Sequence, residues 1–189
     1  MEALYEETPQ VRNLFLLAIY TGMMKSELFR LKWEHIKWAA RQIRVVDAKS
    51  KDANENIKLT AGIKKILRDQ QKLVEQSKFK DMRLGFVFYT PEGLQWKLKS
   101  RSISIIYDRL RKKTRIETDF RMMHGLRHHY GSIHAAAGTP ISVLKDLMRH
   151  SSMKQTERYI TIKEDEMIAA SEKVEKAFFN SAQEADERD

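Results

Sequence analysis

Two short stretches of the sequence carry side chains that could act on a phosphodiester. The first, HGLRHH, contains His124 and Arg127, which lie three positions apart and would share one face of a helix. The second, LMRHSSMKQTERYI, contains His150 and Tyr159, separated by a predicted turn at Ser151-Ser152. Together they offer a hydroxyl nucleophile, two imidazoles for proton transfer and hydrogen bonding, and a guanidinium that can hold phosphate oxygens.

The chemistry of these groups predicts a covalent phosphotyrosine. A tyrosine hydroxyl is a poor nucleophile at its ordinary pKa of about 10, so we expect neighbouring cations to lower the pKa of Tyr159 and to stabilise the charge that develops on phosphorus. Tyr159 would then attack the phosphodiester and remain bonded to it. Each residue also has a purely structural interpretation, because an isolated tyrosine most often packs half-buried and a histidine three positions before an arginine is common by chance.

The composition favours a polyanionic partner. The chain has 189 residues, of which 42% are hydrophobic, so it is long enough for one domain with a sizeable core. Its 35 Lys and Arg outnumber its 26 Asp and Glu, giving a net charge of +9. The absence of cysteine excludes disulfides, thiolate metal sites and cysteine nucleophiles. With no apolar run near the ~18 residues of a membrane span and no signal sequence at the start, we expect a cytoplasmic protein without membrane contact.

The positive charge is concentrated between residues 97 and 115, in KLKSRSISIIYDRLRKKTR. This stretch contains eight Lys or Arg and a single acidic residue. Ile103, Ile106, Tyr107 and Leu110 recur at helical spacing, which predicts an amphipathic helix with one face in the core. Like charges at this density repel one another, so we expect DNA phosphates to neutralise them. The predicted DNA-binding residues are Lys97, Lys99, Arg101, Arg109, Lys112 and Lys113.

The remaining pattern predicts a mixed α/β fold, mainly α-helical with a small three-stranded antiparallel sheet. Apolar residues at helical spacing, a proline at a first turn and terminating glycines mark the helices, and short extended stretches beside polar loops mark the strands. The expected helices cover residues 11–20, a short segment around 26–28, 61–77, 124–137, 140–149 and a last amphipathic stretch at 164–180. The expected strands cover residues 33–38, 42–47 and 56–59, with a further extended piece at 86–90.

These motifs resemble those of the tyrosine recombinases, the phage integrase family. HGLRHHYGS and LMRHSSMKQTERYI are similar to the family motifs H-x-L-R-H, G-H-S-S and T-x-R-Y. Arg127 and Tyr159 are 32 positions apart, against about thirty in the family. Upstream, YTGMMKSELFRLKWEHI is similar to the first motif of the family, T-G-x-R-x-S-E-L followed by L-x-W, and VVDAKSKDANENIKL resembles its lysine-bearing β-hairpin. The resemblance covers roughly residues 9–162 and implies the fold of the family's catalytic domain.

The resemblance implies a role for each candidate residue in site-specific DNA recombination or integration. Tyr159 would attack the scissile phosphate and hold the 3′ end. Arg127 would bind the non-bridging oxygens of that phosphate, and His150 would donate a hydrogen bond to it. His124 would assist proton transfer at the tyrosine.

The hairpin would supply the acid that protonates the leaving 5′ oxygen. Lys49, in D-A-K-S, stands where the family often has its lysine, and Lys51 is the alternative because the loop is slightly longer than usual. Either could instead be a solvated loop lysine. Because the bond energy is kept in the phosphotyrosyl link, the resemblance implies neither a metal nor a nucleotide cofactor. The implied partners are double-stranded DNA and other recombinase protomers, which form a tetramer in the family, whereas we expect the isolated domain to be monomeric.

Two positions depart from the family motifs. Met24 stands where T-G-x-R-x-S-E-L has its arginine, although the neighbouring residues match. A thioether carries no charge, and Lys25, the next residue, would point ~100° away on a helix. One phosphate-binding group is therefore missing, so DNA binding should survive better than the chemical step, and we expect the chain to bind DNA but to cleave it poorly or not at all. Arg149 stands where the family usually has glycine, and we expect it to touch the DNA backbone or to point into solvent. It lies on a different element from the first motif, so we do not expect it to substitute for the missing arginine.

The resemblance also predicts how the chain is organised. Residues 1–180 would form the catalytic domain, in which the helix at 164–180 docks on a neighbouring protomer or packs on its own domain. Residues 181–189 would form an acidic, disordered tail. The N-terminal core-binding domain of the family would be absent from this chain, which looks like a fragment.

Two other functions stay open. The first is a DNA-binding module of the same fold that has lost cleavage, because Met24 replaces the expected arginine. The second is a histidine metalloenzyme in which His124 and His128, four positions apart, hold zinc. The zinc alternative has no support from an H-E-x-x-H glutamate or from cysteine.

Overall fold

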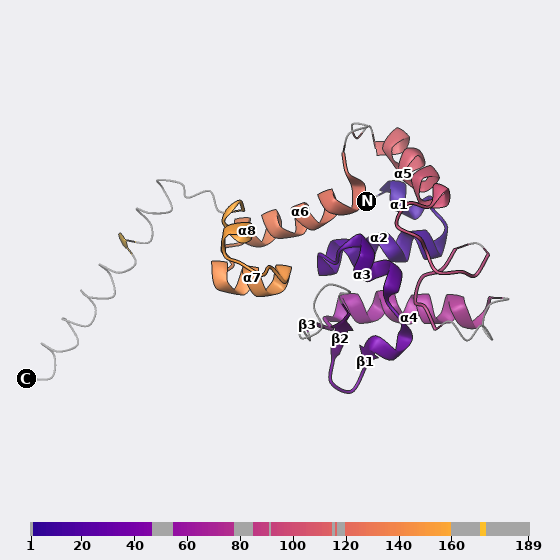
Figure 1. The fold of residues 1–189 in the computed structure, drawn as a ribbon, viewed down its shortest axis with the longest axis horizontal. Helices are drawn as coiled ribbons and strands as arrows, with labels where there is room; N and C mark the ends of the chain where they lie inside the picture. Colours follow the sequence, from indigo (N-terminus) through magenta and orange to yellow (C-terminus); the bar gives the residue numbers. More distant parts are fainter. Residues whose placement is uncertain are drawn as a thin grey trace, which may run out of the picture.

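The computed structural model describes residues 2–46, 55–77, 85–90, 92–114, 116, 120–159 and 171–172 (Figure 1). Within this part the chain is mainly helical and has a three-stranded antiparallel sheet, which confirms the predicted fold class. The α-helices are α1 (Glu2–Tyr5), α2 (Pro9–Thr21), α3 (Lys25–Arg30), α4 (Ala61–Glu75), α5 (Arg101–Thr114), α6 (Met122–Ala136), α7 (Ile141–Met148) and α8 (Lys154–Glu157). The docking helix expected at 164–180, apart from 171–172, and the tail at 181–189 lie outside the described residues.

The turn between α2 and α3 is set by a glycine. α2 ends at Thr21, and Gly22 has a φ of 59° and donates its N–H to the carbonyl oxygen of Ala18. A positive φ of this kind favours glycine, which has no Cβ to clash with the backbone. α3 begins after Met24, whose backbone N–H donates to the carboxylate of Glu27 at 2.7 Å and so caps the helix. The residues that resemble the first family motif therefore lie where two helix ends meet.

The sheet has the order β1-β2-β3, and its neighbouring strands are antiparallel. The strands are β1 (Ile36–Lys37), β2 (Gln42–Val45) and β3 (Glu55–Lys58). The strand expected at residues 33–38 is wrong in its first half, because Trp33–His35 forms a 3-10 helix, η1. The imidazole Nδ1 of His35 accepts a hydrogen bond from the backbone N–H of Lys32 at 3.2 Å. A local side-chain bond of this kind competes with extended structure.

The core lies between α2, α4, α5 and the sheet. α2 packs against both α4 and α6. Ile63 and Leu67 of α4 and Ile103 and Leu110 of α5 are all buried, which confirms the predicted apolar faces of these helices. Thr60 caps α4 by accepting a hydrogen bond from the N–H of Ile63 at 3.3 Å.

α6, α7 and α8 form an arm that reaches away from this core (Figure 1). Met122 and Met123 bury the start of α6 in the core. At the other end of α6, α7 packs against α6 and α8 and buries Leu144 and Met148 completely. We call residues 122–159 the C-terminal arm. It carries the predicted nucleophile and its three predicted partners.

Candidate active site

Tyr159 follows α8 and lies against α6. Its hydroxyl is 2.9 Å from Nδ1 of His128. Its ring stacks on the imidazole of His150, with the ring centroids 6.2 Å apart and an interplanar angle of 14°. Gly131 makes this packing possible, because a Cβ at that position would lie 2.8 Å from the tyrosine ring. The nucleophile predicted from the sequence is therefore half-buried and held by two histidines.

The hydrogen-bond partner of the tyrosine is His128, the last histidine of the H-x-L-R-H motif, to which the sequence had assigned no role beyond the zinc alternative. The Nε2 atoms of His128 and His124 are 2.8 Å apart, so a continuous chain runs from the Tyr159 hydroxyl through His128 to His124. The spacing of four between the two histidines was the available signal. Burial, followed by neighbouring positive charge, lowers the pKa of both histidines. Both therefore favour the neutral form, which can accept a proton.

Arg127 is anchored to the backbone of two other helices. Its exposed fraction is 8%. One guanidinium nitrogen donates to the carbonyl oxygen of Gly22 at 2.7 Å, and another donates to the carbonyl oxygen of Met148. Arg127 thus joins α6 to the end of α2 and to the end of α7. Its positive charge is fixed in place before any substrate arrives.

Met24 faces the same cavity as Arg127 and His124. This cavity has a volume of about 480 Å³, and 36% of the Met24 surface is exposed. Among the described residues that line the cavity none is acidic, and four more are cationic. These are Lys25, Lys99, Arg111 and Arg121. The position of Met24 beside Arg127 agrees with the motif comparison, although the methionine brings no charge to a cavity whose walls suit a phosphate.

His150 lies half-buried at the end of α7. Its Nδ1 is 2.9 Å from the hydroxyl of Thr156, which is completely buried. Burial, followed by the positive charges of Arg127, Arg158 and Arg149, lowers the pKa of His150 to about 4. The imidazole is therefore neutral near pH 7 and has one N–H to donate.

The hairpin approaches His150 through β3. Asn56 of β3 and His150 line the same cavity, which has a volume of about 280 Å³. The hairpin loop at 47–54 lies outside the described residues, and so do both candidate acids, Lys49 and Lys51.

The expected fall in the pKa of Tyr159 is wrong for the protein without DNA. Burial raises the pKa of the hydroxyl, and the charges of Arg127 and Arg158 oppose this only in part. The tyrosine is therefore protonated near neutral pH and needs a base to become nucleophilic. Its contact with His128 meets that need.

The basic helix α5 is neutralised in part by acidic residues of the protein itself, an interaction that was not predicted from the sequence. Arg109 makes two hydrogen bonds to the carboxylate of Glu7, and the Arg109 hydrogen bond lowers the pKa of Glu7. Lys113 lies 3.0 Å from Glu6 and 3.5 Å from Glu7. The other predicted DNA-binding residues are exposed and form no ion pair within the described part of the chain: Lys97, Lys99, Arg101 and Lys112.

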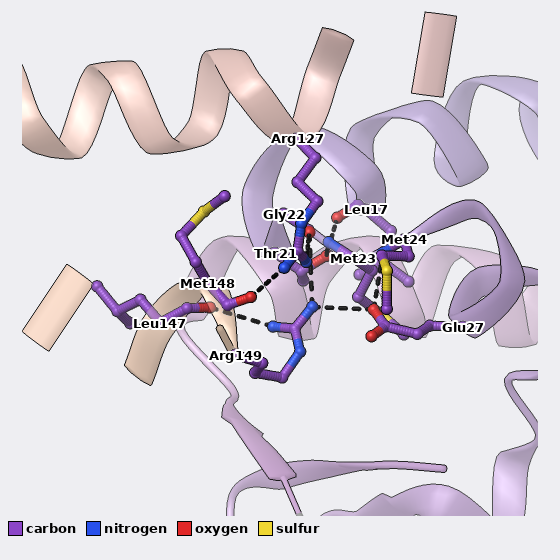
Figure 2. Close-up of polar contacts among 10 residues, drawn as sticks. All are labelled: Leu17, Thr21, Gly22, Met23, Met24, Glu27, Arg127, Leu147, Met148 and Arg149. Carbon is purple, nitrogen blue, oxygen red and sulfur yellow. Dashed lines mark hydrogen bonds and ion pairs between the residues drawn. The ribbon is translucent and has the colours of Figure 1, made fainter. Parts of the chain in front are cut away.

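Arg149 points into the protein, so both expected orientations, toward DNA and toward solvent, are wrong. Its guanidinium lies 2.9 Å from the carboxylate of Glu27, with only 4% and 2% of the two side chains exposed. Figure 2 shows the guanidinium between the end of α7 and the start of α3, beside Gly22 and Arg127. The physical reason is the buried carboxylate, which is costly to leave without a cation.

His124 and His128, the pair considered for zinc, contact each other through their Nε2 atoms, and His128 also contacts the hydroxyl of Tyr159. Over the part of the chain that the structure describes, no three His, Cys, Asp or Glu side chains gather into a group that could hold a metal ion. None of the helices in that part is both long and apolar enough to span a bilayer.

Residues 1–166 match the family described as the phage integrase family. A tyrosine recombinase XerC-like protein of Caldanaerobacter subterraneus subsp. tengcongensis is 22% identical to this chain, over 80% of this chain and 45% of the relative. The crystal structure of XerA recombinase matches with a TM-score of 0.70 at 18% identity, over 90% of this chain and 58% of that one. The Tn1549 transposon integrase, solved in complex with circular intermediate DNA, matches with a TM-score of 0.71 at 19% identity, over 86% of this chain and 57% of that one. The fold is thus shared, and the chain spans about half the length of these relatives.

Proposed function

Because the chain belongs to the phage integrase family, we propose that it cleaves and rejoins double-stranded DNA at specific sites through a 3′-phosphotyrosyl intermediate on Tyr159. The observation that carries the proposal is the contact between the Tyr159 hydroxyl and His128, on the arm that also holds Arg127 and His150. A nucleophile, an adjacent base and fixed phosphate-binding groups are what transfer of a phosphodiester to a side chain requires.

Cleavage begins at the tyrosine hydroxyl. Tyr159 passes its proton to Nδ1 of His128, and His124 stabilises the imidazole from its other side. The tyrosine oxygen bonds to phosphorus while the bond between phosphorus and the 5′ oxygen breaks. Lys49, or Lys51 as the alternative, gives a proton to that oxygen. Rejoining reverses these steps, and because the phosphotyrosyl link keeps the bond energy, no cofactor takes part.

Arg127 and His150 hold the phosphate during this step. Arg127 offers a planar set of N–H donors to the non-bridging oxygens, and the neutral imidazole of His150 offers one more. Negative charge develops where these donors are already fixed, and the loss of one such donor typically costs ~10²–10³ in rate. The cationic walls of the cavity beside Met24 add to the stabilisation of that charge.

The proposed partners are duplex DNA and further copies of the chain, with the chain monomeric in the absence of DNA. The cationic cavity and the exposed lysines and arginines before and along α5 support contacts with phosphates. Two structural neighbours support the same partners: the Tn1549 integrase, solved with circular intermediate DNA, and a lambda integrase dimer bound to a core site. The cytoplasmic location expected from the sequence belongs to the same proposal.

A covalent DNA adduct tests the proposal. The probe is a library of labelled duplexes that carry a random central segment and a single nick, so that a cleaved end can diffuse away and trap the intermediate. We expect the full 189-residue chain to form an adduct that survives denaturing electrophoresis and is unaffected by a chelator. Tyr159→Phe should form none. An adduct of equal yield in Tyr159→Phe, or one that requires a metal ion, would contradict the assignment.

A second candidate is a DNA-binding module of the same fold that has lost cleavage, and Met24 favours it. This alternative predicts retention of the library on the protein with no adduct in either the unchanged chain or Tyr159→Phe. Comparison of retention with adduct yield in one experiment separates the two candidates.

A further inference from the structure

Arg149 holds a backbone conformation that suits glycine. Its φ of 53° and ψ of 48° lie in the left-handed region, where a side chain is strained. Glycine would end α7 in the same conformation without this strain. A strained residue that persists indicates that the surrounding structure compensates for it, and such residues gather at functional sites.

Contacts of the Arg149 side chain, chiefly with residues of the first family motif, compensate for this backbone strain. Besides its ion pair with Glu27, the Arg149 side chain donates to the carbonyl oxygen of Leu147 at 3.1 Å and approaches that of Gly22 at 3.5 Å (Figure 2). Glu27 in turn accepts the backbone N–H of Met24 at 2.7 Å. Arg149 therefore reaches the helix start at which the arginine of the first motif is missing.

The carboxylate of Glu27 needs a cation that Met24 cannot provide. Only 2% of the Glu27 side chain is exposed, and a buried carboxylate that loses its cation is strongly destabilising. Position 24 is the N-cap of α3, three residues before Glu27, so an arginine there could neutralise this carboxylate from the start of the same helix. In this chain the charge comes from the end of α7 instead.

Arg149 is also linked to both phosphate-binding candidates. The carbonyl oxygen of Gly22 that Arg149 approaches accepts a hydrogen bond from Arg127 at 2.7 Å. The next residue is His150, whose backbone N–H donates to the carbonyl oxygen of Lys145 at 3.0 Å. The position of the Arg149 guanidinium thus fixes the end of α7 relative to α2 and α3, and with it the imidazole of His150.

We propose that Arg149 replaces the arginine that the first motif lacks and acts as a positioning residue for cleavage. It neutralises Glu27 and locks the C-terminal arm against α2 and α3, so that Arg127 and His150 meet the scissile phosphate together. This inference rests on the proposed function. It implies that the chain cleaves DNA without any change of sequence, and that Arg149 compensates for the presence of Met24.

Four chains test the pair: the unchanged protein, Arg149→Gly, Met24→Arg, and the double variant Met24→Arg/Arg149→Gly. Single-turnover adduct formation is measured on the nicked random library, and affinity for the same library is measured by retention. We expect Arg149→Gly to slow the adduct step by ~10²-fold or more while changing affinity by less than about threefold. The double variant should recover to within ~10-fold of the unchanged chain, and Met24→Arg alone should bring no gain.

Two controls separate position from charge. Arg149→Lys keeps the charge without the planar fork, so it should fall between the unchanged chain and Arg149→Gly. Lys72→Gln removes one positive charge from the exposed side of α4 and should leave the adduct rate unchanged. Equal rates in Arg149→Gly and the unchanged chain, or a gain from Met24→Arg with Arg149 in place, would overturn the inference.

Thermal unfolding gives a readout that does not depend on activity. Arg149→Gly should lower Tm by several degrees because it orphans Glu27, even though it relieves backbone strain. The double variant should regain most of this loss. If all four chains fail to form an adduct, the proposed function fails. The Tm values still decide whether an arginine at position 24 can replace one at position 149, because the change in the double variant can be compared with the sum of the two single changes. Additive changes in Tm would reject the pair.

Discussion

At His150 the protonation state follows from burial and from the arginines around it. The pKa is about 4 in the folded protein, against the ordinary value of 6.5. Between these two pH values the unfolded chain binds the additional proton and the folded chain does not. The contribution of His150 to stability is therefore present above pH 6.5 and is lost as the pH falls toward 4.

We expect the imidazole of His150 to titrate near pH 4 in the folded protein. Proton NMR on the unchanged chain, with His150→Gln used to assign the signal, measures the pKa directly. The fall in Tm between pH 6.5 and 4 should also be shallower in His150→Gln, because one group that links protonation to unfolding is removed. A bound phosphate favours the charged imidazole, so DNA should raise this pKa. A value near 6.5 without DNA would show that His150 is not enclosed as described.

At the level of elements, α6 positions Tyr159, the proposed nucleophile, by lacking a side chain at Gly131. The ring of Tyr159 occupies the space that a Cβ at Gly131 would need. This close approach keeps the hydroxyl within 2.9 Å of His128, one turn earlier on the same helix. α6, His128 and Tyr159 therefore form one packed unit, in which the proposed base touches the proposed nucleophile.

Gly131→Ala tests this unit. Alanine favours a helix by up to ~1 kcal/mol over glycine, so the fold should not be weakened by propensity. The added methyl group should push the Tyr159 ring away from His128 and slow adduct formation by ~10-fold or more, because the reacting groups lose their alignment. Tm and single-turnover adduct rates measure the two effects. Ser132→Ala, at an exposed position next to it, is the matched control and should alter neither.

The elements that follow from local patterns were predictable from the sequence. The apolar spacing of α4 and α5 and the glycine at the end of α2 gave those helices within a few residues. Trp33–His35 was misjudged because residues 33–38 as a whole contain Trp, Ile and Trp, which suit a strand, whereas the His35 imidazole forms a local bond with the Lys32 backbone. A hydrogen bond between one side chain and a nearby backbone group cannot be identified from the pattern of apolar and polar residues alone.

The contacts of the site that link distant residues could not be predicted in the same way. Tyr159 and His128 are separated by 31 positions, and Arg149 and Glu27 by 122. The inward direction of Arg149 depends on a left-handed backbone that a non-glycine residue rarely adopts. The glycine that the family usually has at this position was the available signal for that conformation, but it did not indicate where an arginine side chain would point. The motifs located the candidate residues, but only the packing within the arm, and of the arm against α2 and α3, shows which of them touch.

Across the whole molecule, the positive charge divides into cations that the protein uses internally and cations that face solvent. Arg109 and Lys113 of α5 bind the carboxylates of Glu6 and Glu7, which ties α5 to the segment after α1. Lys99 instead lines the cationic cavity beside Met24. The net charge of +9 therefore overstates how much of α5 is available to DNA and understates how strongly charge is focused at the site.

The salt dependence of DNA binding distinguishes these two classes of cation. Each phosphate contact lowers the logarithm of the binding constant by ~0.9 for each tenfold rise in salt, because a bound lysine or arginine releases a condensed counterion. Lys99→Gln should therefore reduce the slope by about 0.9 and weaken binding to all sequences alike. Arg109→Gln/Glu7→Gln removes an internal ion pair with no net change in charge, so it should leave the slope as it is. Both slopes are measured by fluorescence anisotropy of a labelled random duplex over a range of salt concentrations.

Equal losses of slope in the two variants would mean that Arg109 leaves Glu7 to bind DNA. An unchanged slope in Lys99→Gln would place the phosphates away from the cavity.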